Sequence, residues 1–298
     1  MTKKIRNILF LSCLFLFIIF APLIILYSQG YRFDFDPPAG GKRIVQTGGL
    51  AVITPLKSVE VYLDGKLAGK SGSLFSDTFF VGELLPKKYK VEMRKQGFHS
   101  WEKNLEVREK EVTKIRNVIL FPEEITFPAL GNNAELIKTT FGENILTPGS
   151  PDADKYYIDE LGYFYKENDT LYFLKNEADD SEKISDSNNS LEISPDSQKA
   201  FLSSGSELWL FSAEKGELKK TFLFRLSEKI ENCLWLKNDY LIFNAGGKIK
   251  IAEIDPRDKI NIIEISDKNP SKMIYLEKTD RLYILRDGAI YQSQPLTE

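Results

Sequence analysis

The chain has 298 residues, 42% hydrophobic and 28% charged, a composition that argues for folded domains and against global disorder. Its net charge of −3 is unevenly spread. Residues 1–48 contain six basic and two acidic residues, and residues 49–122 contain thirteen basic and nine acidic residues. Residues 123–298 contain twenty-one basic and thirty-two acidic residues. The acidic C-terminal part argues against a nucleic acid partner. Frequent Tyr, Phe, Val, Ile and Thr favour strands, so we expect an all-β body.

Residues 8–27 form an uncharged apolar run that predicts a transmembrane helix. Twenty residues at 1.5 Å each span about 30 Å, the thickness of a bilayer core. Lys3, Lys4 and Arg6 precede the run, so the positive-inside rule keeps residues 1–7 in the cytoplasm and sends the body across. A cleaved signal peptide is the alternative. The length of the run and the lack of an A-x-A-like site after it favour an uncleaved anchor.

Prolines and glycines make residues 28–48 a predicted spacer. Residues 49–122 then alternate as strands do, and predict a β-sandwich of six or seven short strands. Asp64-Gly65 predicts a hairpin turn with positive φ at both residues. The residues expected on inward faces are Val59, Val61, Leu63, Tyr89, Val91, Met93, Trp101, Leu105, Val107, Val112, Ile115, Val118 and Leu120.

Residues 49–122 also resemble the PEGA domain, a small surface-layer-type β-sandwich. The matching segments are Val59-Glu60-Val61-Tyr62-Leu63-Asp64-Gly65, Gly69, Leu85-Pro86-Lys87-Lys88-Tyr89-Lys90-Val91, Lys95-Gln96-Gly97-Phe98 and Asn117-Val118-Ile119-Leu120. Pro55-Leu56-Lys57-Ser58 stands in place of the name-giving Pro-Glu-Gly-Ala, and Lys87 in place of a usual glycine. The resemblance implies a location in the bacterial cell envelope and a passive role without known chemistry.

A repeat of about 40 residues begins after Pro122. Ser150-Pro151-Asp152 and Lys155 recur as Ser194-Pro195-Asp196 and Lys199, each followed by apolar residues. Two further hairpins turn at Gly246-Gly247 and Asp287-Gly288. Such a period predicts β-propeller blades, about four in residues 123–298, and resembles TolB-like and WD40-like propellers. The last copy stops at Tyr291, before an outer strand. The ring is either small and closed by a strand from residues 125–147, or an open arc.

No catalytic, cofactor or metal site is predicted. The only histidine, His99, lies two residues before Trp101 and is expected to be structural. Without a G-x-S-x-G elbow or a phosphate-binding loop, serine hydrolase and P-loop chemistry lack their motifs. The acidic stretch Asp179-Asp180-Ser181-Glu182, with Asp186, lacks calcium-loop spacing and is expected to be a solvated loop. Cys13 and Cys233 are expected to form no disulfide.

The sequence therefore predicts a membrane-anchored extracytoplasmic scaffold or adaptor that binds protein or cell-wall glycan and is not an enzyme. Two alternatives stay open. One is a sensor acting through another membrane protein, for which Ser12 and Cys13 in the apolar run are the only polar hints. The other is a propeller glycosidase or lyase, which would need paired carboxylates brought together by the fold.

Overall fold

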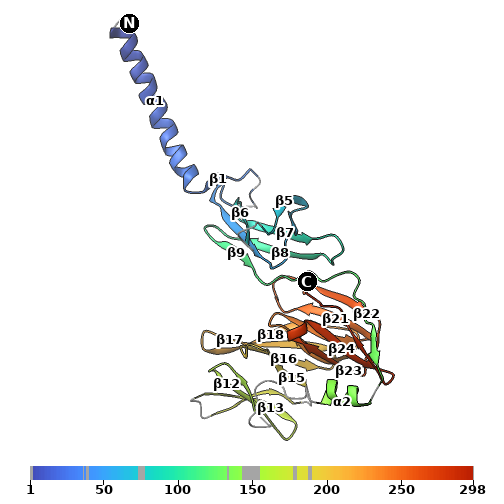
Figure 1. Cartoon of the computed structure of the whole chain (residues 1–298). Helices are drawn as coiled ribbons and strands as arrows, with labels where there is room; N and C mark the ends of the chain where they lie inside the picture. The colour runs from blue at the N-terminus through green and yellow to red at the C-terminus, as the bar shows by residue number, and fades with distance from the viewer. Residues whose placement is uncertain are drawn as a thin grey trace. The chain divides into compact units, whose positions relative to one another are not determined.

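The computed structural model describes residues 3–35, 37, 40–72, 78–132, 134–142, 155–176, 180–186 and 190–297. The chain forms two compact units. The first comprises Met1–Met93 and Glu102–Ile119, and the second Arg94–Trp101 and Leu120–Glu298. Both units are built mostly from strands (Figure 1). The predicted all-β body behind an apolar N-terminal helix is confirmed.

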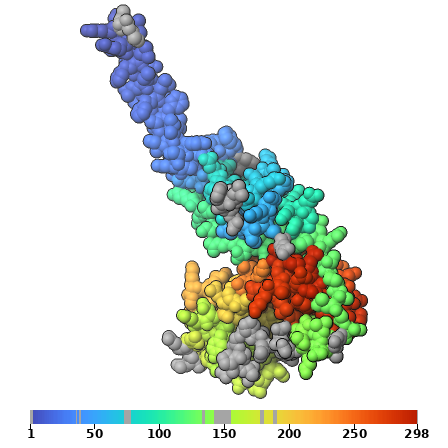
Figure 2. Space-filling model, viewed as in Figure 1, coloured from blue at the N-terminus to red at the C-terminus, as the bar shows by residue number. Residues whose placement is uncertain are grey.

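Helix α1 (Lys3–Ser28) contains the predicted apolar run and begins five residues before it. None of its side chains is buried, and the helix stands clear of other parts of the chain in Figure 2. Its leucines, isoleucines and phenylalanines are exposed along the whole length. The helix is long and apolar enough to cross a membrane, a property that a signal sequence shares.

The predicted spacer is not structureless, because it contains a two-stranded antiparallel ribbon. Strand β1 (Tyr31–Phe33) pairs with β2 (Ile44–Gln46), with Phe33 opposite Ile44 and Tyr31 opposite Gln46. Sequence reasoning missed this ribbon, since strands of three residues are too short to show a period of two.

Seven strands in the described part of residues 48–115 then form a small β-sandwich, at the upper end of the predicted number. Their bounds are β3 (Gly48–Ile53), β4 (Glu60–Leu63), β5 (Lys66–Lys70), β6 (Thr78–Leu84), β7 (Lys87–Arg94), β8 (Trp101–Val107) and β9 (Val112–Ile115). One sheet has the order β6-β3-β9, with β3 and β9 parallel, and the other β5-β4-β7-β8. Asp64 and Gly65 turn the β4–β5 hairpin with φ of 49° and 75°, as predicted.

The inward faces of the sandwich follow the predicted alternation with two exceptions, Val112 and Lys103. Val112, expected inside, is 44% exposed, and Lys103 is a buried charged residue. Glu92 is also buried, although it lies on the opposite side of β7 from Val91 and Met93. Glu92 pairs with Lys90 at 3.0 Å, which offsets part of the cost of removing its carboxylate from water. Lys103 lies on the same side of β8 as Trp101 and Leu105 because residues two apart share a face.

Within the described residues, the second unit contains four four-stranded antiparallel sheets, as the repeat predicts. The first holds β11 (Lys155–Ile158), β12 (Gly162–Glu167), β13 (Thr170–Lys175) and β14 (Glu182–Ser185). The second holds β15 (Ser190–Ile193), β16 (Lys199–Ser204), β17 (Glu207–Glu214) and β18 (Glu217–Arg225). The third holds β19 (Ile230–Leu236), β20 (Tyr240–Ala245), β21 (Lys248–Glu253) and β22 (Ile262–Ser266).

The fourth sheet is assembled from both ends of the unit. Strands β23 (Lys272–Leu276), β24 (Arg281–Arg286) and β25 (Ala289–Gln292) are followed by β10 (Ala129–Gly131) as the outer strand. Ala129 pairs with Tyr291, so the missing outer strand does come from residues 125–147. Helix α2 (Ala134–Gly142) follows β10 along the chain, and a short 3₁₀ turn, Glu277–Thr279, joins β23 to β24.

The first three sheets bury apolar side chains against one another. On β16, Leu202 packs toward the first sheet, in a cluster with Phe164. Its chain neighbour Phe201 points the other way and packs with Phe243 of the third sheet. A strand with both faces buried is therefore apolar without alternation, and each buried Phe or Leu contributes about 1.5–3 kcal/mol.

Candidate functional site

The Ser-Pro-Asp motif at Ser194 forms the turn between β15 and β16. The Ser194 hydroxyl donates to Asp196 Oδ1 at 2.6 Å, and the amide of Gln198 donates to the same oxygen at 3.1 Å. The amide of Lys199 donates to Ser194 Oγ at 2.9 Å. Asp196 thus caps a turn amide, as the sequence predicts. The earlier copy at Ser150 lies outside the described residues.

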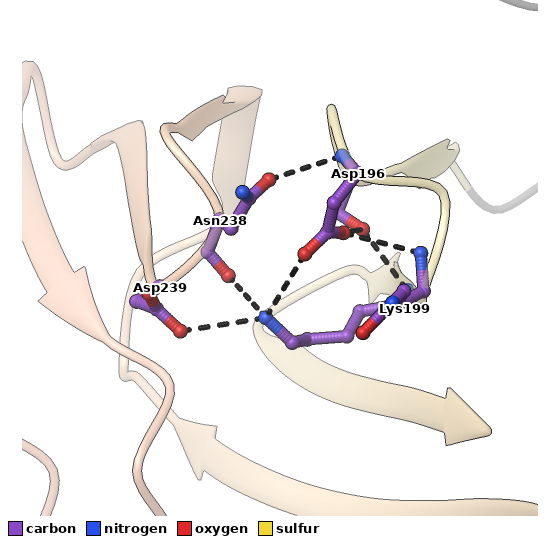
Figure 3. Close-up of polar contacts among 6 residues, drawn as sticks. Asp196, Lys199, Asn238 and Asp239 are labelled. Carbon is purple, nitrogen blue, oxygen red and sulfur yellow. Dashed lines mark hydrogen bonds and ion pairs between the residues drawn. The ribbon is translucent and has the colours of Figure 1, made fainter. Parts of the chain in front are cut away.

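The Lys199 side chain connects this turn to the third sheet. Figure 3 shows its ammonium group among Asp196, Asn238 and Asp239, the last two from the turn between β19 and β20. Lys199 Nζ lies 2.7 Å from the backbone oxygen of Asn238 and 3.4 Å from Asp239 Oδ1. In return, the Asp196 amide donates to Asn238 Oδ1 at 3.1 Å.

Similar contacts continue through the corresponding turns of all four sheets. The Asp159 amide of the first sheet donates to the backbone oxygen of Ser197 at 2.7 Å. Lys237 of the third sheet donates to Thr297 Oγ1 at 2.6 Å, and Thr297 donates to Asp280 Oδ2 of the fourth at 2.7 Å. We call this set of contacts the turn chain. Its polar groups bind one another, so its role is to join the sheets.

A second feature is a row of tyrosines on the first sheet. Tyr157 pairs with Tyr163 across β11 and β12, and Tyr165 with Tyr172 across β12 and β13. Ring centroids of successive neighbours lie 5.3, 6.0 and 5.4 Å apart, the usual spacing of interacting rings. Lys155 Nζ lies 4.6 Å from the centroid of Tyr163. We call these four tyrosines the tyrosine face.

The tyrosine face lies opposite the side that the first sheet packs against the second. Phe164 and Phe173 alternate with the tyrosines along β12 and β13 and belong to the buried cluster shared with the second sheet. Tyr157 is 42% exposed, and the other three rings are partly exposed. A row of partly exposed aromatic rings with polar hydroxyls is typical of binding surfaces.

Two neutral acidic groups lie near each other between the second and third sheets. Burial raises the pKa of Glu192 on β15 to about 8, and its carboxyl accepts no hydrogen bond from the described residues. Burial also raises the pKa of the Cys233 thiol on β19 well above its ordinary value, and the nearby Glu192 adds to this rise. A thiol that stays protonated is a poor nucleophile and a poor metal ligand.

Glu253, by contrast, is a buried carboxylate with several partners. Its Oε1 accepts from the backbone and the side-chain amide of Asn261, at 2.9 and 2.7 Å. Its Oε2 accepts from Trp101 Nε1 at 2.8 Å. These bonds offset the cost of burying the charge, which is the expected arrangement for a structural carboxylate.

His99 and the acidic stretch are also described. The His99 amide donates to the backbone oxygen of Phe121 at 2.8 Å, and its buried Nε2 has no partner among the described residues. Asp179 lies outside the described residues. Asp180 and Glu182 are exposed, and Asp186 forms an ion pair with Lys183. The described part of the chain gathers no three His, Cys, Asp or Glu residues able to hold a metal.

Sequence reasoning missed the tyrosine face and Glu192. The tyrosine face had a readable signal, since Tyr163 and Tyr165 alternate with Phe164. Glu192 had no such signal in the sequence, because the burial of its carboxyl depends on packing between strands that lie far apart in the sequence. Ser12 and Cys13 lie on α1, where Cys13 is exposed.

No protein-family model matches the sequence, and no curated protein matches it. Solved structures with β-propeller folds do resemble it. A β-propeller domain from Myceliophteria thermophila is 11% identical, with 77% of this chain and 86% of that chain covered and a TM-score of 0.36. A putative 6-phosphogluconolactonase from Bacteroides uniformis is 12% identical, with 78% and 72% covered and a TM-score of 0.35.

A chain of a mitotic checkpoint complex is 8% identical, with 71% of this chain and 74% of that chain covered and a TM-score of 0.36. Likenesses this distant carry no argument about activity or partners. The propeller-like description rests on the four sheets themselves.

Proposed function

We propose that the chain is a membrane-anchored scaffold or adaptor of the cell envelope, with its β units outside the cytoplasm and the tyrosine face as its surface for a protein partner. The observation that carries the binding role is the tyrosine face. Tyrosine is enriched at protein interfaces because its ring supplies apolar contact area and its hydroxyl a hydrogen bond.

The anchor is supported by α1, whose apolar side chains are all left without protein cover. Lys3, Lys4 and Arg6 at its start favour a cytoplasmic N-terminus. The resemblance of residues 49–122 to the PEGA domain agrees with an envelope location and is part of the proposal.

A binding role, rather than an enzymatic one, is supported by how the polar groups are used. The turn chain joins the sheets, and Glu253 is occupied by Trp101 and Asn261. The Cys233 thiol is held protonated by its burial beside Glu192.

The test has two parts. The first is N-terminal sequencing of the membrane-extracted protein, together with protease digestion of intact cells. An uncleaved N-terminus with digestible β units is expected. A start near Gly30 would contradict the anchor.

The second part replaces Tyr157 of the full-length chain with a photo-crosslinking amino acid in its native membrane. A discrete protein adduct is expected, and it should disappear when Tyr163 and Tyr165 are both changed to Ser. The control places the crosslinker at Phe222 of β18, which is 45% exposed. Adducts with cell-wall glycan alone, or equal adducts at both positions, would contradict a protein partner at the tyrosine face.

A further inference from the structure

The ribbon β1–β2 has one apolar face that the described chain leaves partly uncovered. Phe33 and Ile44 lie directly opposite each other and so share this face. They are 46% and 59% exposed. Phe35 extends the face, because its ring centroid lies 5.0 Å from that of Phe33 and its side chain is 89% exposed. Three large apolar side chains therefore gather at one place on the surface.

The other face of the ribbon is fastened to the sandwich. Arg32 and Val45 lie opposite each other on that face, and Val45 is buried. Arg32 forms an ion pair with Glu83 of β6 at 2.9 Å. Because successive residues of a strand point to opposite sides, this attachment turns Phe33 and Ile44 away from the sandwich.

The ribbon is also tied to the end of α1. Arg32 Nη1 donates to the backbone oxygen of Tyr27 at 2.8 Å, and the guanidinium lies 3.6 Å from the centroid of the Tyr27 ring. The amide of Gly30 donates to the same Tyr27 oxygen at 3.1 Å. The amide of Thr47, next to β2, donates to the backbone oxygen of Gly30 at 2.9 Å. The ribbon is thus held within a few residues of the last apolar turn of the helix.

We propose that the ribbon lies in the headgroup region of the bilayer, with Phe33, Phe35 and Ile44 inserted among the lipids and Lys42 and Arg43 against lipid phosphates. This inference rests on the membrane anchor of the proposed function. A ribbon fixed to the end of a spanning helix lies at the depth where aromatic side chains are stable. Lys42 and Arg43 are exposed and form no ion pair within the described residues, which leaves both cations for anionic headgroups.

The experiment uses the full-length chain, alone, in vesicles of phosphatidylcholine and phosphatidylglycerol. In a Cys233→Ala background, an environment-sensitive fluorophore on the native Cys13 reports insertion of α1. In the Cys13→Ala, Cys233→Ala background, the fluorophore is placed by Phe35→Cys. The matched control is Leu67→Cys on β5, where Leu67 is 53% exposed. Lipids with quenchers at shallow or deep positions read the depth of each label.

The label at residue 35 is expected to be quenched most by the shallow quenchers. The label at residue 67 is expected to be quenched by neither the shallow nor the deep quenchers. Replacing the anionic lipid with phosphatidylcholine should shift the equilibrium of the ribbon from headgroups toward water by up to about 30-fold, as expected for two surface cations, and should lower the shallow quenching accordingly. A quenched label at Cys13 with an unquenched label at residue 35 would overturn the ribbon proposal alone. Unquenched labels at both positions would overturn the anchor as well. Because no other protein is present, quenching by lipids at residue 35 also excludes a protein as the necessary cover.

Discussion

Lys199 joins the turn of the second sheet to Asn238 and Asp239 of the third (Figure 3), so its loss should weaken the second unit. Lys199→Met keeps the length of the side chain but leaves the Asn238 oxygen and the Asp239 carboxylate without this donor. We expect the free energy of unfolding to fall by about 1–3 kcal/mol, the usual cost of a lost charged hydrogen bond. Chemical denaturation of the full-length chain measures this.

The matched control is Lys219→Met. Lys219 also pairs with an acidic residue, Glu214 at 3.0 Å, but both side chains are 53% exposed. An exposed pair is stabilising by less than about 1 kcal/mol. Equal effects of the two substitutions would show that the turn chain does not join the sheets.

Glu192 predicts a dependence of stability on pH. Its folded pKa is about 8, above the ordinary value of 4.5, so between these values the folded chain holds a proton that the unfolded chain releases. Stability from this group is full below pH 4.5 and is lost as the pH rises toward 8. Glu192→Gln should flatten this part of the profile and raise the melting midpoint at pH 8. An unchanged slope between pH 5 and 8 would show that the carboxyl is solvated.

The β4–β5 hairpin depends on a glycine with positive φ. Gly65 has φ of 75°, and a Cβ there would meet no atom within 4 Å, so any cost of substitution comes from the backbone. Gly65→Val should lower stability by about 1 kcal/mol or more. Lys66→Val, one residue later in β5, is the control and should change little. The melting midpoints of the two variants test this, and equal midpoints would contradict a role for positive φ at Gly65.

Element by element, the sequence predicts what depends on local pattern. The apolar run of α1, the Asp64-Gly65 turn and the hairpins at Gly247 and Gly288 are all read from neighbouring residues. The position of a strand within its sheet, by contrast, cannot be read from neighbouring residues. The motif aligns Lys155 with Lys199, yet Lys155 begins the first strand of its sheet and Lys199 the second.

The candidate site was less predictable than the fold. The tyrosine face could be read from alternation within β12, but that its rings join across three strands required the register. The burial of Glu92 and Lys103 and the partial burial of Glu192 depend on neighbours distant in sequence, which composition does not reveal.

At the scale of the whole molecule, residues 44–122 are predicted to fold without the rest. Strands β3–β9 have their own buried core, including Leu50, Val61 and Val91. Residues 95–100 and 120–122 belong to the second unit and lie outside strands β7–β9, so their amides should exchange rapidly in the isolated fragment. Dispersed amide signals in an NMR spectrum of residues 44–122 are expected. A collapsed spectrum would contradict the two-domain interpretation.

The fourth sheet imposes an order of events on biosynthesis. Strand β10 leaves the ribosome long before β25, its partner about 160 residues later in the chain. Until β25 has been made, β10 is an unpaired strand edge, open to association with other chains. The sheet is therefore completed only after nearly the whole polypeptide exists. A chain truncated before residue 289 would lose two strand pairs at once. Removal of β25 abolishes its pairing with β24 and also leaves β10 without a partner.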